Sequence, residues 1–165
     1  MEKRILLWMV AILTLCSCST SDNIYDPISL SKVSHSDCGN HIRTRGEYAP
    51  KLKLTYNKDS KTITGEYINY TLNCDYTNAG INIDHDVDGA LVLNPWNDGE
   101  GKANCICHIN IYFTIHKATM PRYHLILNRQ KVIIHEGDGS IREEIWTDYD
   151  GVISFSTQNT ITINL

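Results

Sequence analysis

The chain has 165 residues, and its 15 lysines and arginines are outnumbered by 19 aspartates and glutamates, which leaves a formal net charge of −4. An acidic balance argues against nucleic acid as a partner, because binding to nucleic acid depends on Lys and Arg side chains that neutralise phosphates. The length suits one domain with a hydrophobic core of its own.

The first residues predict an exported protein. Residues 1–17 have the pattern of a bacterial secretory signal, in which a short charged start precedes the apolar run 5–15. That run is too short to span a bilayer as a helix, which takes about 20 residues. The signal ends in Leu15-Cys16-Ser17-Cys18-Ser19, a sequence that resembles the lipobox of bacterial lipoproteins.

We therefore expect Cys18 to be the first residue of the mature protein and to carry the lipid chains, palmitate among them. Ser19, rather than Asp, follows this anchor and favours the outer membrane, on its periplasmic or its cell-surface face. Ordinary signal cleavage nearby is the alternative, and it would leave a secreted protein with a free thiol. Residues 18–34 are predicted to be a polar tether, and residues 35–165 a single domain.

The mature chain is predicted to be almost wholly β-strand. Segments of alternating apolar and polar residues, rich in Val, Ile, Thr and Tyr, recur between short turns. This spacing predicts a two-sheet antiparallel sandwich of the immunoglobulin-like kind, with a small β-barrel as the alternative. Strands are expected at 51–56, 62–73, 81–87, 90–93, 104–116, 123–128, 131–135, 144–147, 151–156 and 160–165.

Two connecting segments are predicted to lack strand structure. Residues 94–102 combine Pro, Gly, Asn and Asp, which is typical of a loop. Residues 140–145 could form a helical turn, because Ser140 and Glu143 stand in the positions of a capping box.

Four cysteines follow the anchor, at positions 38, 74, 105 and 107. On the strand 104–116, Cys105 and Cys107 share a face with four apolar residues, so both are expected to point into the core. Side chains two residues apart on a strand are parallel and about 6.6 Å apart at Cα, which does not suit a bond between the two. In an exported chain we expect two disulfides, either Cys38–Cys105 with Cys74–Cys107, or Cys38–Cys107 with Cys74–Cys105.

The order of these motifs resembles a group of small Bacteroidetes lipoproteins. The shared features are Asn73-Cys74, a hairpin, Cys105-Ile106-Cys107 at the head of an alternating strand, and Tyr123 in a closing strand. The Leu-Cys-Ser-Cys-Ser end of the signal is similar too. The likeness covers residues 36–128, and it implies an immunoglobulin-like sandwich rather than any particular activity.

Two kinds of candidate site remain. Asp84, Asp86 and Asp88 resemble the start of a calcium loop, although a solvated acidic face that ends in an Asp-Gly hairpin turn is the interpretation we favour. Trp96 and Trp146 are candidates for ligand binding, because exposed Trp stacks on sugars or forms hot spots with proteins. The alternative is that each tryptophan closes one end of the sandwich.

The sequence contains none of the common catalytic motifs, such as G-x-S-x-G, H-E-x-x-H or a P-loop. We therefore expect a protein that is not an enzyme and needs no cofactor. The leading hypothesis is an outer-membrane lipoprotein that presents loops to an extracytoplasmic protein or glycan. The alternatives are a structural or assembly lipoprotein without a ligand, and a small polysaccharide hydrolase.

Overall fold

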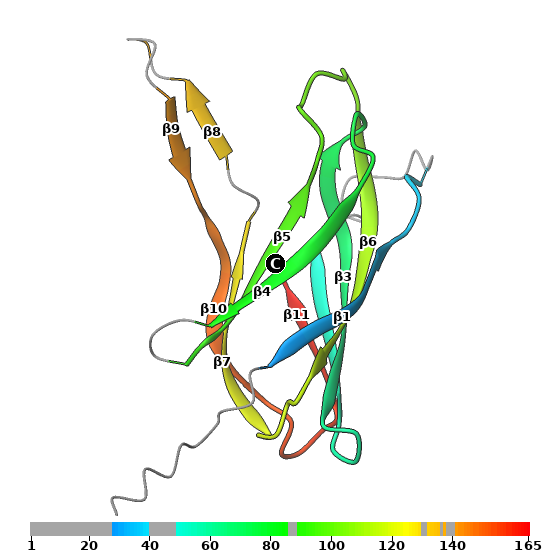
Figure 1. Cartoon of the computed structure of the whole chain (residues 1–165), viewed down its shortest axis with the longest axis vertical. Coiled ribbons are helices and arrows are strands. Elements are labelled where there is room, and N and C mark those ends of the chain that lie inside the picture. The colour runs from blue at the N-terminus through cyan, green and yellow to red at the C-terminus, as the bar shows by residue number, and fades with distance from the viewer. Residues whose placement is uncertain (1–27, 40–48, 86–88, 130–131, 136, 138–140) are drawn as a thin grey trace, which may run out of the picture.

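The computed structural model describes residues 28–39, 49–85, 89–129, 132–135, 137 and 141–165 of the chain (Figure 1). The regular structure within these residues consists of strands, and none of it is a helix with the length and apolar character that crossing a bilayer requires. The strands are β1 (Ser29–His35), β2 (Lys51–Asn57), β3 (Thr62–Asn73), β4 (Ala79–His85), β5 (Leu91–Asn97), β6 (Ile106–His116), β7 (Arg122–Asn128), β8 (Val132–His135), β9 (Ile141–Glu144), β10 (Thr147–Ser154) and β11 (Thr160–Asn164).

These strands form two large sheets and one separate hairpin. The five-stranded sheet has the order β1-β6-β3-β2-β11, the four-stranded sheet has the order β10-β7-β5-β4, and β8 pairs with β9. The two large sheets face each other across a shared core, and neither closes on itself (Figure 1). The predicted two-sheet sandwich with two disulfides is therefore confirmed, in the layered architecture of immunoglobulin-like domains, and the barrel alternative is wrong.

One strand pair departs from the predicted antiparallel arrangement. β5 and β7 run parallel, with Leu91 opposite Leu125 and Leu93 opposite Leu127, whereas the other strand pairs among the described residues are antiparallel. The path of the chain explains this pair. Between β5 and β7 the chain crosses to the other sheet as β6 and then returns, so β5 and β7 point the same way.

Alternation along the strands builds the core. On β6, the odd-numbered residues from Cys107 to Ile115 are buried, and the even-numbered residues lie toward the surface. Burying one aliphatic side chain of this size contributes roughly 1.5–3 kcal/mol. The largest fully buried aliphatic side chains are Leu52, Leu54, Ile63, Ile81, Leu91, Leu93, Ile109, Ile111, Ile115, Leu125 and Leu127.

The first strand lies inside the segment predicted as a tether. Residues 29–34, together with His35, form β1, which pairs with β6 from Ser29 opposite His116 to His35 opposite Ile111. The sandwich therefore begins before residue 35. β1 is an edge strand whose side chains are exposed or half-buried, so it needs no apolar alternation, and its mostly polar sequence carries no strand signal.

Two other local predictions are wrong. β5 continues through Pro95 to Asn97, into the predicted loop 94–102, because it stays paired with β4 up to Asn97. Its pairing with β7 ends at Leu93. Beyond that point β5 is an edge strand, where proline is tolerated. Within the predicted helical turn at 140–145, residues 141–144 form β9 instead, because their backbone pairs with β8, whereas so short a helix would lack support.

Candidate binding site at the disulfide end

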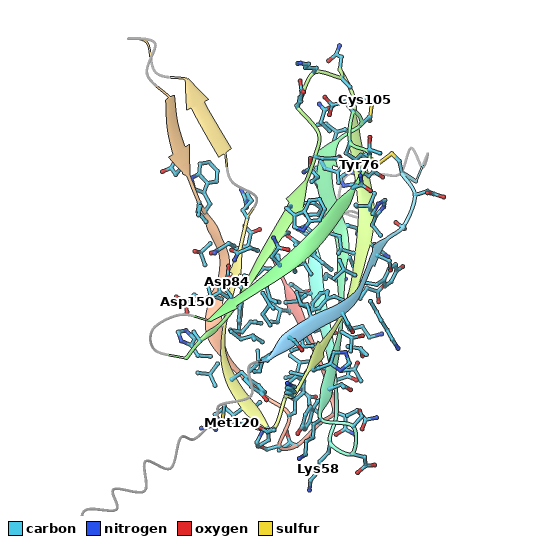
Figure 2. The ribbon with its side chains drawn as sticks, in the orientation of Figure 1. Lys58, Tyr76, Asp84, Cys105, Met120 and Asp150 are labelled. Atoms are coloured by element: carbon cyan, nitrogen blue, oxygen red, sulfur yellow. A yellow bond between two sulfur atoms is a disulfide. The ribbon has the colours of Figure 1, made fainter. Side chains whose placement is uncertain are left out.

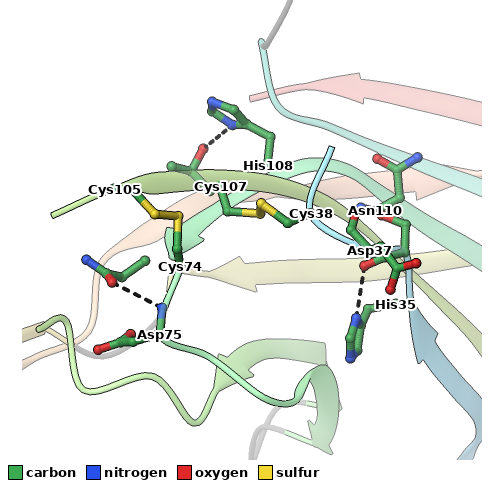
Figure 3. The surroundings of a disulfide bond; sticks show 12 residues. His35, Asp37, Cys38, Cys74, Asp75, Cys105, Cys107, His108 and Asn110 are labelled. Atoms are coloured by element: carbon green, nitrogen blue, oxygen red, sulfur yellow. Dashed lines mark hydrogen bonds between the residues drawn. A yellow bond between two sulfur atoms is a disulfide. The ribbon is translucent and has the colours of Figure 1, made fainter. Parts of the chain in front are cut away.

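Both predicted disulfides are present, as Cys38–Cys107 and Cys74–Cys105 (Figure 3). This is one of the two pairings that the sequence left open. Cys107 is 1% exposed and points into the core as predicted. Cys105 is exposed, which corrects the prediction for that residue, because β6 begins only at Ile106 and the core no longer covers the strand there. Stable disulfides of this kind are typical of proteins outside the cytoplasm, so we describe the protein as extracytoplasmic.

The end of the sandwich that contains these bonds is here called the disulfide end, and it comprises residues 35–38, 74–79 and 96–105. One bond ties the segment after β1 to β6, and the other ties the end of β3 to the start of β6. The backbone N–H of Cys74 also donates to the carbonyl of Cys105 at 3.2 Å. Three segments that are distant in the sequence are therefore covalently fixed side by side.

Two aspartates fix the loops at the same end. The carboxylate of Asp98 accepts hydrogen bonds from the backbone N–H groups of Thr77 and Asn78, at 2.7 and 2.8 Å, and from Asn78 Nδ2 at 3.0 Å. Asp75 accepts from the backbone N–H of Lys102 at 2.7 Å. These donors lower the pKa of both carboxyl groups, with Asn78 contributing most at Asp98 and Lys102 most at Asp75. The β3–β4 and β5–β6 loops thus hold each other through one carboxylate each.

Trp96 lies beside these loops with its indole packed on a glycine. Gly80 on β4 stands directly opposite Trp96 on β5. A Cβ atom at Gly80 would lie 3.0 Å from Cε2 and Cζ2 of the indole, so the ring rests on bare backbone. Trp96 is nevertheless 37% exposed. One side of the ring is therefore supported while part of the indole stays accessible, which is the arrangement that a stacking platform requires.

A hollow of about 510 Å³ lies next to this indole, between β1 and the loops that Asp98 holds. His35 lies on its β1 side, and its Nδ1 donates to the carbonyl of Ser36 at 3.0 Å. In the neutral imidazole, Nε2 is therefore left as the acceptor. The His35 ring also meets Tyr76 edge to face, with 5.6 Å between the centroids. The hollow is lined by Val33, Ser34, His35, Asn78, Ala79, Trp96 and Asp98.

The second predicted tryptophan does not line this hollow. Trp146 lies between β9 and β10, is 46% exposed, and has the guanidinium of Arg129 at 5.4 Å from its ring centroid. Arg129 Nε and Nη2 donate to Oδ1 of Asp148 at 2.9 and 2.5 Å, and these hydrogen bonds raise the pKa of the guanidinium. The two tryptophans thus belong to different parts of the surface, and Trp146 is not among the residues that line the hollow beside Trp96.

The calcium interpretation stays a prediction, because Asp84 alone of its three aspartates lies among the described residues. Asp84 Oδ2 accepts a hydrogen bond from Asn94 Nδ2 at 2.8 Å on the surface of the four-stranded sheet. Asp86 and Asp88 lie outside the described residues, as does the predicted lipid anchor, Cys18. Among the residues that the structure does describe, no three His, Cys, Asp or Glu side chains gather as a metal site would need.

Sequence reasoning selected Trp96 as a candidate but did not identify the residues that the structure places around it. Gly80, His35 and Asp98 come from three elements, and no spacing in the sequence relates them. The only local signal is the polar turn Thr77-Asn78 and the Asn97-Asp98 pair, which both suit backbone capping. No protein-family profile, curated protein or solved structure matches the chain.

Proposed function

We propose that this protein is a lipid-anchored lipoprotein of the outer membrane, which binds an envelope protein or glycan through the hollow beside Trp96 and does not catalyse a reaction. The observation that carries the proposal is the partly exposed indole of Trp96, which packs on Gly80 beside a hollow of about 510 Å³. A tryptophan supported on one side is a common anchor for the apolar face of a sugar or for a protein side chain.

The rigidity of the disulfide end favours binding. Two disulfides and the carboxylates of Asp75 and Asp98 hold the surrounding loops in place before any partner arrives. A partner that docks here then orders few additional groups, so little of its contact energy is offset by lost conformational freedom.

The hydrogen bonds to Asp98 argue against one catalytic role in the hollow, that of a general acid. All three hydrogen bonds to Asp98 come from the protein itself and lower the pKa of its carboxyl group. A carboxylate held in this way is a poor proton donor at neutral pH, whereas general acid catalysis needs a raised pKa. Asp98 is therefore assigned a role in positioning the β3–β4 loop.

The anchor is the part of the proposal that rests on sequence alone. Cys18 with Ser17 before it supports acylation, and β1 begins eleven residues after Cys18. The disulfides support export, which acylation of this kind requires. A mass measurement on the N-terminal peptide of the protein purified from its own membrane tests the anchor directly.

Affinity capture from the native envelope, together with binding to arrayed glycans, tests the proposed site. We expect Trp96→Ala to weaken capture of its partner roughly 30-fold or more, the loss of a hot-spot side chain worth about 2 kcal/mol. Trp146→Ala is the matched control, because it removes an exposed indole that does not line the hollow. Capture that survives both changes would favour the structural lipoprotein without a ligand, and turnover of a polysaccharide would favour the hydrolase.

A further inference from the structure

The end of the sandwich opposite the disulfides is closed by three connections, which we call the loop ring. They are residues 57–61, 117–121 and 155–159. Three backbone hydrogen bonds link these connections and the strands that they join. The N–H of Ala118 donates to the carbonyl of Lys61 at 2.9 Å, and the N–H of Phe155 donates to the carbonyl of Pro121 at 2.7 Å. The N–H of Tyr56 donates to the carbonyl of Asn159 at 2.8 Å. Figure 2 shows Lys58 and Met120 at this end and Cys105 at the other.

A second hollow of about 510 Å³ lies within the loop ring. Its floor is apolar, because the buried rings of Tyr56 and Phe155 lie 5.3 Å apart between centroids and Pro121 lies beside them. Lys58 and Lys61, both exposed, stand at its edge. The hollow therefore combines an apolar interior with two ammonium groups, which suits an amphiphilic anion.

Among the residues that the structure describes, the two ends of the sandwich carry charges of opposite sign, although the whole chain is acidic. The loop ring and the start of β7 carry four exposed cationic side chains, which are Lys58, Lys61, Lys117 and Arg122. They carry one carboxylate, that of Asp59. The disulfide end carries four carboxylates and one cation: Asp37, Asp75, Asp98 and Glu100 against Lys102. An anionic surface would therefore attract the loop ring and repel the disulfide end.

The chain also enters the sandwich at the loop ring. Ser29, the first residue of β1, lies opposite His116, and His116 lies opposite Thr62 on its other side. These residues adjoin the 57–61 and 117–121 connections. The segment that leads from Cys18 to Ile28 therefore joins the domain at its basic end, and a lipid on Cys18 would bring this end, rather than the disulfide end, to the membrane.

We propose that the hollow of the loop ring receives the phosphorylated headgroup of an anionic lipid in the membrane to which the protein is tethered, an inference that rests on the proposed lipid anchor. The ammonium groups of Lys58 and Lys61 pair with the phosphate, as lysine commonly does. The glycerol and first methylenes of the lipid contact Pro121, Phe155 and Met120, whose side chain is 44% exposed. The Trp96 hollow then faces away from the membrane, toward partners.

Hydrogen exchange on the acylated protein in vesicles tests this inference. Amides of residues 57–61 and 117–120 are expected to exchange more slowly in vesicles of phosphatidylglycerol and phosphatidylcholine than in phosphatidylcholine alone. High salt should weaken this protection, because it screens the attraction between the lysines and the anionic lipid. Lys58→Gln with Lys61→Gln should abolish it. Lys51→Gln with Lys53→Gln, on the β2 strand that precedes the ring, is the matched control and should preserve it.

Three results would overturn the inference. The first is equal protection in both kinds of vesicle, and the second is protection that survives the Lys58 and Lys61 changes. The third is the same lysine-dependent protection by inorganic phosphate without anionic lipid, since that would identify a site for a free anion.

The anchor and the headgroup site can fail separately. If the mass of the N-terminal peptide shows no acyl chains, the proposed anchor is wrong. Cosedimentation of that unacylated protein with the two kinds of vesicle then decides the headgroup site. Binding that needs both phosphatidylglycerol and the two lysines would support it, and binding that needs neither would overturn it.

Discussion

Two glycines within strands let aromatic rings lie directly on a neighbouring backbone. Gly65 on β3 faces Phe113 on β6, and Gly80 on β4 faces Trp96 on β5. The two positions differ in what surrounds the ring. Phe113 is buried in the core, whereas Trp96 is half-exposed and has room to move outward. The same substitution should therefore have different consequences at the two sites.

Gly65→Ala is expected to destabilise the fold by about 1–3 kcal/mol, because the new Cβ would overlap the buried Phe113 ring and the core would have to shift. An ideal Cβ at Gly65 lies only 2.1 Å from Cζ of that ring. Gly80→Ala, with its nearest indole atoms at 3.0 Å, is the control and should cost less. Urea unfolding of both variants measures the difference. Equal losses would show that the core accommodates the extra methyl group as easily as the surface does.

Among the strands, β6 has the central structural role. It lies between β1 and β3. Cys107 on β6 supplies one sulfur to the first disulfide, and Cys105, just before β6, supplies one to the second. The Cys38–Cys107 bond spans 69 residues and contains a buried sulfur, whereas the Cys74–Cys105 bond spans 31 residues and lies near the surface. The first bond restricts the unfolded chain over a longer loop and also attaches an edge strand to the core.

Paired replacement by serine should rank the two bonds. The chain-entropy relation gives a loss of about 4.4 kcal/mol for Cys38→Ser with Cys107→Ser and about 3.7 kcal/mol for Cys74→Ser with Cys105→Ser. A buried serine hydroxyl in place of Cys107 should widen this gap. Denaturant unfolding without reductant measures both losses. The opposite order would mean that the surface bond, through the loops of the disulfide end, contributes more than its loop length indicates.

At the scale of the whole molecule, two tyrosines join the sheets from within. Tyr67 and Tyr70 on β3 are buried, and the hydroxyl of Tyr67 lies 3.4 Å from Asp148 on β10. Burial raises the pKa of both phenols, to about 12 for Tyr70, and the charge of Asp148 raises that of Tyr67 further. The folded protein therefore keeps protons that the unfolded chain loses near pH 10.

The free energy of unfolding should consequently fall as the pH rises from about 10 to 12. Each buried phenol adds about 1.4 kcal/mol per pH unit to this decline, because the unfolded state binds fewer protons in that window. Tyr70→Phe should reduce the slope of this decline by the contribution of one phenol, about 1.4 kcal/mol per pH unit. Tyr112→Phe, at an exposed position, is the control. Urea midpoints across this pH range give the slope. An unchanged slope for Tyr70→Phe would mean that its phenol ionises in the folded state as readily as in the unfolded one.

Much of this architecture follows from local pattern. Period-two alternation identified β2, β3, β6 and β7, and it placed Cys107 in the core, because a strand buried on one face must alternate. The spacing of two residues between Cys105 and Cys107 excluded a bond between them, because strand geometry holds their side chains parallel. Edge segments escaped this reasoning. β1 buries few side chains, so its sequence can be polar. Pro95 predicted a loop, but it lies in the part of β5 that has a neighbouring strand on one side only.

By itself the sequence predicted that the chain is built of strands and that four of its cysteines form two bonds in one of two patterns, because each conclusion depends on residue chemistry or on neighbours along the chain. Only the tertiary structure decided the rest. It selected Cys38–Cys107 and Cys74–Cys105, set β5 parallel to β7, and assembled the Trp96 hollow from β1, β4 and β5. These outcomes depend on which distant segments lie side by side, and that is settled by how the two sheets stack over their shared core rather than by any local pattern.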